Sequence, residues 1–246
     1  MKIIIYLISF SLIIPLYSIL AYAGQKSSTV TQKNRVIILS DIGADPDDSE
    51  SMVRLLLYSN EIDIEGLIAT TSCWQKTIVH PDYIRNIIHA YGKVQPNLNK
   101  HEAGFPSAES LLRNLKQGIS EYGMQGVGEG KDSPGSKLIL KVLEEKDERP
   151  LWIYVLGGVN TLAQALYEIK KTKTKAEMEK LIAKLRIYTI SDQDDSGVWI
   201  RKNFPVLFYI VSPGDYYGSA TWSAINSYKS GINNEEISNA WLAKNI

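Results

Sequence analysis

The chain has 246 residues, 44% of them hydrophobic, and it carries 27 basic and 27 acidic side chains. This neutral balance excludes an electrostatic case for nucleic acid as a partner, because binding to phosphates needs a basic surface. Cys73 is the only cysteine, which excludes an intramolecular disulfide. No histidine is adjacent to it, so we interpret Cys73 as a small buried residue and not as a nucleophile.

The first 23 residues have the pattern of a secretory signal peptide. Lys2 precedes an apolar stretch that runs from Ile3 to Leu20, and Ala21, Tyr22 and Ala23 form an A-x-A cleavage site. Pro15 interrupts the stretch, which favours a cleaved signal over a permanent membrane anchor. We therefore expect a secreted or periplasmic protein that has no membrane attachment once its signal is removed.

After a polar, flexible leader over residues 24–34, the sequence predicts one domain over residues 35–246 in which strands alternate with helices. Apolar runs typical of buried strands occupy residues 36–39, 62–71, 151–156, 185–190 and 206–211. Helical patterns occupy residues 49–57, 81–91, 108–117, 136–145, 161–171, 172–184 and 199–204. Residues 92–106 and the glycine-rich residues 122–135 are expected to be loops, the second of them mobile. Continuous apolar strands indicate an α/β, Rossmann-like fold with a mostly parallel sheet covered by helices on both faces.

Four aspartates, Asp41, Asp45, Asp47 and Asp48, follow the first strand within eight residues. A helix N-terminus offsets only about 0.3–1 kcal/mol per charge, which is little for so dense a cluster. A divalent cation would neutralise more of it, and ligands that are all oxygens suit calcium or magnesium. The alternative is that Asp47 or Asp48 caps the helix and that the other acids are solvated.

Two other predicted strands also end in polar residues, Gly157–Asn160 and Ser191–Asp195. The carboxyl ends of parallel strands lie at one edge of a sheet, where α/β proteins bind ligands, so the three polar clusters can converge. Each also has a simpler interpretation. Asn160 can cap the helix that follows it, and the acids at 192, 194 and 195 can cap the helix that runs through Trp199.

Residues 41–51, DIGADPDDSES, resemble the D-x-D-P-G-x-D-D signature of the calcium-dependent nucleoside hydrolases, and LGGVNTLAQAL, from Leu156, resembles their G-P-L-T-N-L-A segment. The chain is more similar still to the nucleoside hydrolase-like domain of exported bacterial proteins described as cellulose-binding. Residues 41–74 fit almost throughout the pattern TDIGxEPDDxxSxVRLLLYSNxxDIEGLIATTSxW of that domain. The resemblance covers roughly residues 35–211 and implies the nucleoside hydrolase-like fold.

The resemblance implies a calcium ion held by Asp41, Asp48 and the backbone carbonyl of Asn160, with Asp47 and Asn160 at the sugar hydroxyls. Asp41 or Asp45 would act as general base toward a water that attacks an oxocarbenium-like centre. Direct attack by that water would invert the sugar centre.

Two departures from the hydrolase pattern bear on this mechanism. The middle aspartate of the signature aligns with Gly43, and Asp45 is the nearest acid that could replace it. The hydrolases carry a further aspartate ligand near their C-terminal end, for which Asp215 is a weak substitute, so a C-terminally truncated domain is one alternative. Trp74 is a candidate wall of the sugar site, with a core aromatic at a strand end as its alternative.

Three functions follow from these observations. The first is an exported calcium-dependent hydrolase of N-riboside or related glycosyl bonds, acting on a small sugar or nucleoside. The second is a non-catalytic carbohydrate-binding domain that retains the acidic turn and binds a polysaccharide such as cellulose. The third is a structural domain whose acidic turn only begins a helix.

Overall fold

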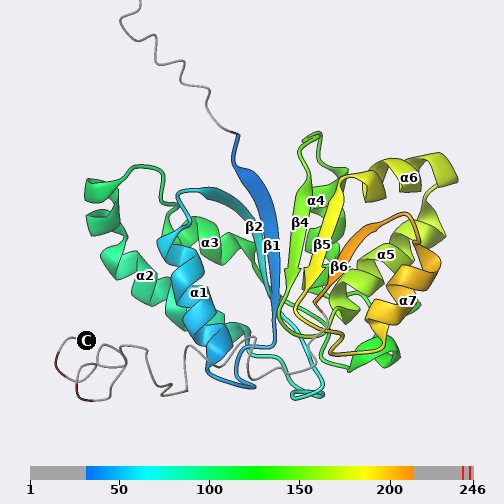
Figure 1. The fold of residues 1–246 in the computed structure, drawn as a ribbon, viewed down its shortest axis with the longest axis horizontal. Helices are drawn as coiled ribbons and strands as arrows, with labels where there is room; N and C mark the ends of the chain where they lie inside the picture. The colour runs from blue at the N-terminus through cyan, green and yellow to red at the C-terminus, as the bar shows by residue number, and fades with distance from the viewer. Residues whose placement is uncertain (1–31, 213–239, 241–243, 245–246) are drawn as a thin grey trace, which may run out of the picture. The chain divides into compact units, whose positions relative to one another are not determined.

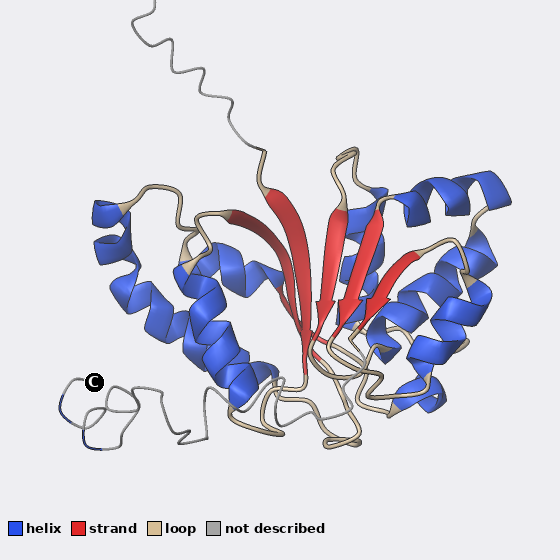
Figure 2. Ribbon diagram, viewed as in Figure 1, coloured by secondary structure: helices blue, strands red, loops and turns tan. Residues whose placement is uncertain are grey.

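The computed structural model describes residues 32–212 together with Ala240 and Lys244. Within this part of the chain six strands form one sheet in the order β3-β2-β1-β4-β5-β6, and every neighbouring pair is parallel (Figures 1 and 2). The strands are β1 (Asn34–Ser40), β2 (Ile62–Ala69), β3 (Leu115–Gln117), β4 (Leu151–Val155), β5 (Leu185–Thr189) and β6 (Phe208–Val211). The predicted parallel sheet is confirmed, and the end of the predicted leader, Asn34, begins β1.

Helices lie on both faces of the sheet, as predicted (Figure 2). They are α1 (Asp47–Leu57), α2 (Pro81–His101), α3 (Ala108–Asn114), α4 (Pro134–Glu144), α5 (Asn160–Thr172), α6 (Lys175–Ala183) and α7 (Ser196–Asn203), with a 3₁₀ turn at Gly123–Gly126. No helix among the described residues is long and apolar enough to cross a membrane.

The period-two pleat of the strands divides the interior into two hydrophobic cores. In β1, Ile37 and Leu39 point into the core that α4–α7 cover, whereas Ile38 points into the core that contains Met52 and Leu56 of α1. Both faces of β1 are thus buried, which is why its apolar residues form a continuous run and do not alternate with polar ones.

The structure corrects two element boundaries. The predicted loop at residues 92–106 is helical up to His101, because tertiary contacts hold the second half of α2. The Gln95 amide donates to the Phe105 carbonyl oxygen at 3.1 Å, and the Tyr91 hydroxyl donates to that of Pro106 at 2.8 Å. The helix predicted for residues 108–117 ends at Asn114, and the next three residues pair with β2 as the short strand β3.

The glycine-rich loop at residues 122–135 is held against the carboxyl edge of the sheet by hydrogen bonds. The Tyr122 hydroxyl donates to the Gln193 carbonyl oxygen at 3.0 Å, and the Met124 amide donates to Asp195 Oδ1 at 2.8 Å. The Gln164 side chain accepts a hydrogen bond from the Gly128 amide at 2.8 Å. These contacts to the turn between β5 and α7 and to α5 hold the loop, which the sequence predicted to be mobile, along this edge.

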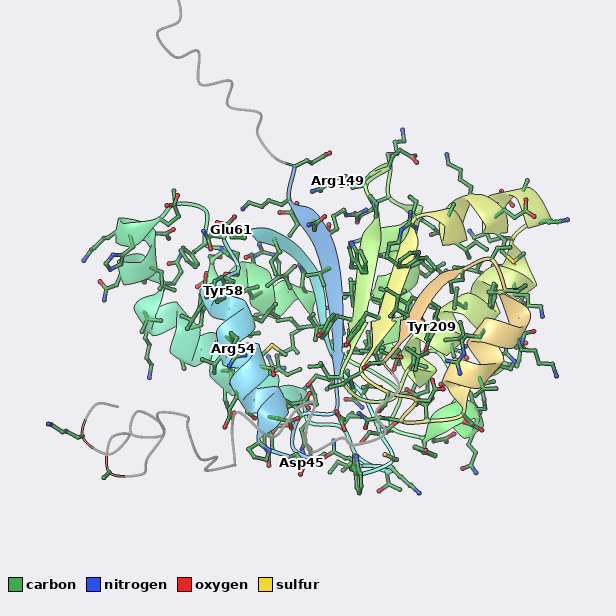
Figure 3. All side chains as sticks on the ribbon, in the orientation of Figure 1. Asp45, Arg54, Tyr58, Glu61, Arg149 and Tyr209 are labelled. Carbon is green, nitrogen blue, oxygen red and sulfur yellow. The ribbon has the colours of Figure 1, made fainter. Side chains whose placement is uncertain are left out.

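A network of ion pairs lies at the opposite, amino edge of the sheet, where Figure 3 labels Arg149. Arg149 bonds Asp147 at 2.7 Å and Asp63 at 2.6 Å. The buried Arg35 pairs with Glu65 at 2.7 Å and lies 3.4 Å from Asp147. Hydrogen bonds from the side chain and backbone of Arg149 lower the pKa of Asp147 to about 2. The charges of this edge are therefore paired with one another.

Candidate functional site

The three polar clusters predicted from the sequence meet at the carboxyl edge of the sheet. Asp41 follows β1, Gly157 and Gly158 follow β4, and Asp194 follows β5. A Cβ atom added at Gly157 would stand 2.7 Å from Asp41 Oδ1, and one added at Gly158 would overlap the Asp194 carboxylate. The Gly158 amide also donates to the carbonyl oxygen of Thr71, beyond β2, at 2.7 Å. The double glycine therefore lets the ends of four strands approach one another.

Asp41 and Asp48 are the two buried carboxylates of the acidic turn, with 4% and 7% of their surface exposed. Burial raises the pKa of Asp41 to about 6 against a hydrogen bond from Ser72 that lowers it. Burial also raises the pKa of Asp48 to about 7, and the nearby charge of Asp41 adds to this. Asp48 accepts a hydrogen bond from Ser40 Oγ at 2.5 Å. Asp41 and Asp48 are thus held together in surroundings where ionising either carboxyl group costs free energy.

The other two aspartates of the turn lie further out. Asp45 is exposed, and Figure 3 shows it in the loop beyond the carboxyl ends of the strands. Asp47 is half-buried, and partial burial raises its pKa. Neither Asp47 nor Asp48 is the cap residue of α1, because the cap position is Pro46. The helix-cap interpretation of these aspartates is therefore wrong.

Gly43 has a backbone conformation and surroundings that disfavour a side chain. Its φ is +101°, and a Cβ atom there would lie 2.8 Å from Cδ2 of His80. His80 is itself stacked on Tyr83, with ring centroids 4.7 Å apart. An aspartate, which the hydrolase signature carries at this position, would be strained and would require the His80 ring to shift.

Asn160 is fully buried, and its side chain ties strand ends together. Its Nδ2 donates to Thr71 Oγ1 at 3.0 Å and to the Glu121 carbonyl oxygen at 2.7 Å, while its Oδ1 accepts from Thr70 Oγ1 at 3.1 Å. Asn160 is the first residue of α5 and its side chain makes no cap, so the predicted cap is wrong. The Asn160 side chain is therefore engaged within the protein, where it ties the start of α5 to the end of β2.

Asp194 belongs to the same edge, as expected for the cluster Ser191–Asp195, although it was not among the predicted catalytic, substrate-binding or metal residues. It is 5% exposed, and its Oδ2 accepts a hydrogen bond from the Asn160 amide at 3.2 Å. Its Oδ1 accepts from the Ser196 amide at 2.9 Å. Burial raises the pKa of Asp194 despite these bonds. In the sequence Asp194 stands out only because it follows a predicted strand, and a residue that merely caps the next helix has the same position.

Trp74 is 69% exposed, so its interpretation as a core aromatic is wrong. Its backbone amide donates to Ser72 Oγ at 3.1 Å, and Ser72 also bonds Asp41. The indole is therefore exposed at the surface, and the backbone of Trp74 is linked through Ser72 to the buried Asp41 carboxylate. Cys73 beside it is exposed as well, which corrects the expectation that this cysteine is buried.

The described part of the chain contains no group of three or more histidine, cysteine, aspartate or glutamate residues placed to hold a metal ion. Asp41 and Asp48 supply two carboxylates, whereas calcium takes about six to eight oxygen ligands. Asp215, the weak substitute for a further ligand, lies outside the described residues. Calcium binding therefore stays a prediction, with Asp41 and Asp48 as the side chains that would hold the ion.

Known proteins share the sequence and the fold of this domain. Residues 35–246 match the family described as cellulose-binding Sde182, nucleoside hydrolase-like domain. A nucleoside hydrolase-related hypothetical protein from Saccharophagus degradans, described as associated with carbohydrate metabolism, is 46% identical over 73% of this chain, with a TM-score of 0.72.

This chain spans 44% of the length of that protein. A plant nucleoside hydrolase is 14% identical over 65% of this chain and 48% of its own, with a TM-score of 0.39. No protein with a curated description matches significantly. The match over residues 35–246 means that the chain belongs to the Sde182 nucleoside hydrolase-like domain family.

Proposed function

We propose that this domain binds a carbohydrate at the carboxyl edge of its sheet and holds it without cleaving it. The family name includes cellulose binding, and the relative from Saccharophagus degradans is described as associated with carbohydrate metabolism. These names belong to the relatives, and the chemistry of this edge is what makes a sugar a suitable ligand for the present chain.

The edge offers the two kinds of group that recognise a sugar. Asp41 and Asp48 are adjacent buried acids, which suits them to accept hydrogen bonds from neighbouring hydroxyl groups of one ring. Trp74 presents an exposed indole, against which the apolar face of a sugar ring can pack. Burial strengthens the polar contacts because water competes less for them.

The observation that carries the choice of binding over cleavage is the conformation of Gly43. The resemblance implies that the hydrolases place an aspartate here as ligand and probable base, and a side chain at φ +101° beside the His80 ring would be strained. The proposed replacement, Asp45, is exposed in the loop, and within the described part of the chain no hydrogen bond or ion pair fixes its side chain. A general base takes the proton of its water across about 2.6–3.2 Å, and an exposed loop carboxylate is less well placed for this than a buried one.

A second candidate function is the calcium-dependent hydrolysis of N-ribosides or related glycosyl bonds. The burial of Asp41 and Asp48 at aligned positions of the hydrolase signature favours it. A calcium ion, when bound, would orient the sugar diol and lower the pKa of a water. Asp41 would then accept the proton of that water, and Asp47 would bind a sugar hydroxyl. Hydrolysis of a glycosyl bond distinguishes this candidate from the first, which binds the sugar without cleaving it.

The test is a pull-down of the purified protein on insoluble cellulose, with calcium and with chelator. Aryl ribosides and β-glucosides are assayed in parallel for hydrolysis. We expect retention without turnover, and at least a tenfold weaker retention for Asp41→Asn and Asp48→Asn. Asp45→Asn is the matched control, since this neighbouring acid is exposed, and it should bind as the parent does.

Hydrolysis above the background rate that disappears in Asp41→Asn would replace the first candidate by the second. Failure to bind cellulose, soluble cello-oligosaccharides and ribose, with or without calcium, would contradict both.

A further inference from the structure

A groove of about 560 Å³ lies between α1 and the sheet, next to the candidate site. Its lining includes Asp48 at the carboxyl edge of the sheet, Tyr154 of β4 and Tyr188 of β5. Pockets that hold small ligands usually enclose about 300–1,000 Å³, so the groove has the size of a binding pocket. One of the two buried acids of the site therefore opens onto a hollow that can hold a ligand.

Polar side chains of α1 follow Asp48 along this groove. Ser51, Arg54 and Tyr58 all line it, and their spacing of three or four residues places them on one face of the helix. Figure 3 shows Arg54 and Tyr58 on α1, progressively further from the edge where Asp45 lies. From Asp48 to Tyr58 a helix rises about 15 Å, which is longer than one sugar ring. A row of hydrogen-bonding groups thus leads away from Asp48.

The sheet supplies two tyrosine hydroxyls on the opposite side of the groove. The rings of Tyr154 and Tyr188 are stacked with their centroids 4.9 Å apart and an angle of 19° between their planes, so they stand side by side. Neither hydroxyl is hydrogen-bonded to another residue in the described part of the chain, where Arg54 likewise has no ion pair. These three groups are available as hydrogen-bond donors to a ligand.

The mixture of groups in the groove suits a sugar better than a purely apolar ligand. Met52, Leu55 and Leu156 give the lining an apolar surface, against which the C–H face of a sugar ring can pack. The hydroxyl groups around the edge of the ring would meet Arg54 and the tyrosine hydroxyls. A lipid chain or a bare aromatic ring would cover those polar groups without bonding them, which costs free energy.

We propose that the groove binds the further units of a linear oligosaccharide whose first unit lies at Asp41 and Asp48. This inference rests on the proposed function, and it extends the same site along α1. The groove is continuous with that site, because Asp48 belongs to both. Its length along the helix selects a chain of sugars over a single one, since only a chain reaches from Asp48 to Tyr58.

The experiment is a calorimetric titration of the full chain with glucose and with its β-1,4-linked oligomers of two to five units. We expect the affinity to rise at least tenfold from glucose to the tetramer, because each further unit adds contacts in the groove. Arg54→Ala should reduce this gain at least threefold. The matched control is Arg85→Ala, since Arg85 is an exposed arginine of α2 that does not line the groove, and it should retain the full gain.

A second variant tests the opposite wall without disturbing its packing. Tyr154→Phe combined with Tyr188→Phe keeps both rings and removes only the hydroxyls, and it should also reduce the gain at least threefold. Asp48→Asn should instead weaken glucose and the tetramer alike, because it acts on the first unit.

The outcomes separate this inference from the function on which it rests. Equal affinities for glucose and for every oligomer would overturn the inference and leave sugar binding at the carboxyl edge intact. A gain with length that ignores the groove variants would place the further units elsewhere on the protein and would overturn it as well. Absence of binding at every length would contradict the proposed function and the inference together.

Discussion

The carboxylate of Asp41 lies directly against the Cα atom of Gly157, so that a Cβ atom at position 157 would stand 2.7 Å from Asp41 Oδ1. These residues are 116 positions apart in the sequence and follow β1 and β4, which are adjacent in the sheet. The contact fixes the site in two ways. It buries the Asp41 carboxylate, and it requires a residue without a side chain after β4.

Gly157→Ala should therefore lower the free energy of unfolding by about 1–3 kcal/mol, because the added methyl group overpacks a closed site. Urea unfolding measures this cost. The cost should be smaller in an Asp41→Ala background, where the space is open, so a double-mutant cycle should give a coupling of at least about 0.5 kcal/mol. Additive effects of the two changes would show that the contact does not limit the site.

Asp48→Asn should raise the stability of the protein when it is measured in chelator at pH 8. The ionised carboxylate is buried beside Asp41, and an amide of the same shape removes that cost while its oxygen can still accept from Ser40. We expect a gain on the order of 1–3 kcal/mol. Asp45→Asn, at the exposed end of the turn, should change stability by less than about 0.5 kcal/mol. A loss of stability in Asp48→Asn would contradict the burial cost inferred for this acid.

Gly43→Asp restores the side chain of the hydrolase signature, and we expect it to destabilise the fold without creating hydrolysis. A non-glycine residue at φ +101° stores strain of about 1–3 kcal/mol, and the new Cβ atom would meet the His80 ring. Thermal unfolding and a riboside assay report the two effects. Ala44→Asp introduces the same charge one residue later, at a position that already carries a Cβ atom, so its cost should be smaller.

Asp147 should make the stability of the protein sensitive to acid. Its folded pKa of about 2 lies below its unfolded value of 3.8, so its contribution is present above pH 4 and is lost as the pH falls toward 2. Asp147→Asn should lower the free energy of unfolding at pH 7 by about 1 kcal/mol, discounted for partial exposure, and should flatten its fall between pH 4 and pH 2. Urea titrations at several pH values test this.

The matched control for that change is Glu148→Gln, since Glu148 is exposed and lies 3.8 Å from Lys180. This change should have little effect on the free energy of unfolding, either at pH 7 or at pH 2. If the free energy of unfolding falls with acid as steeply in Asp147→Asn as in the parent, the acid dependence belongs to other carboxyl groups.

Much of the fold follows from local sequence patterns. The run Val36 to Leu39 predicts a strand buried on both faces, and the stripe Leu162, Ala165, Leu166 and Ile169 predicts α5, because each pattern repeats with the period of its element. β3 could not be predicted, since three residues carry too little periodicity and pair only because β2 lies beside them. The extension of α2 through Gly92 and Pro96 depends likewise on contacts with residues 105, 106 and 108.

By itself the sequence determined that acids follow the first strand and that a double glycine follows a later one, because residue type and local period are properties of the chain. Only the tertiary structure decided that Asp41 and Asp48 are buried together, that Asp45 and Trp74 are exposed, and that Asp194 joins the site. The exposure and pKa of a side chain depend on atoms that distant segments bring around it, here the turn after β4 and the end of β2.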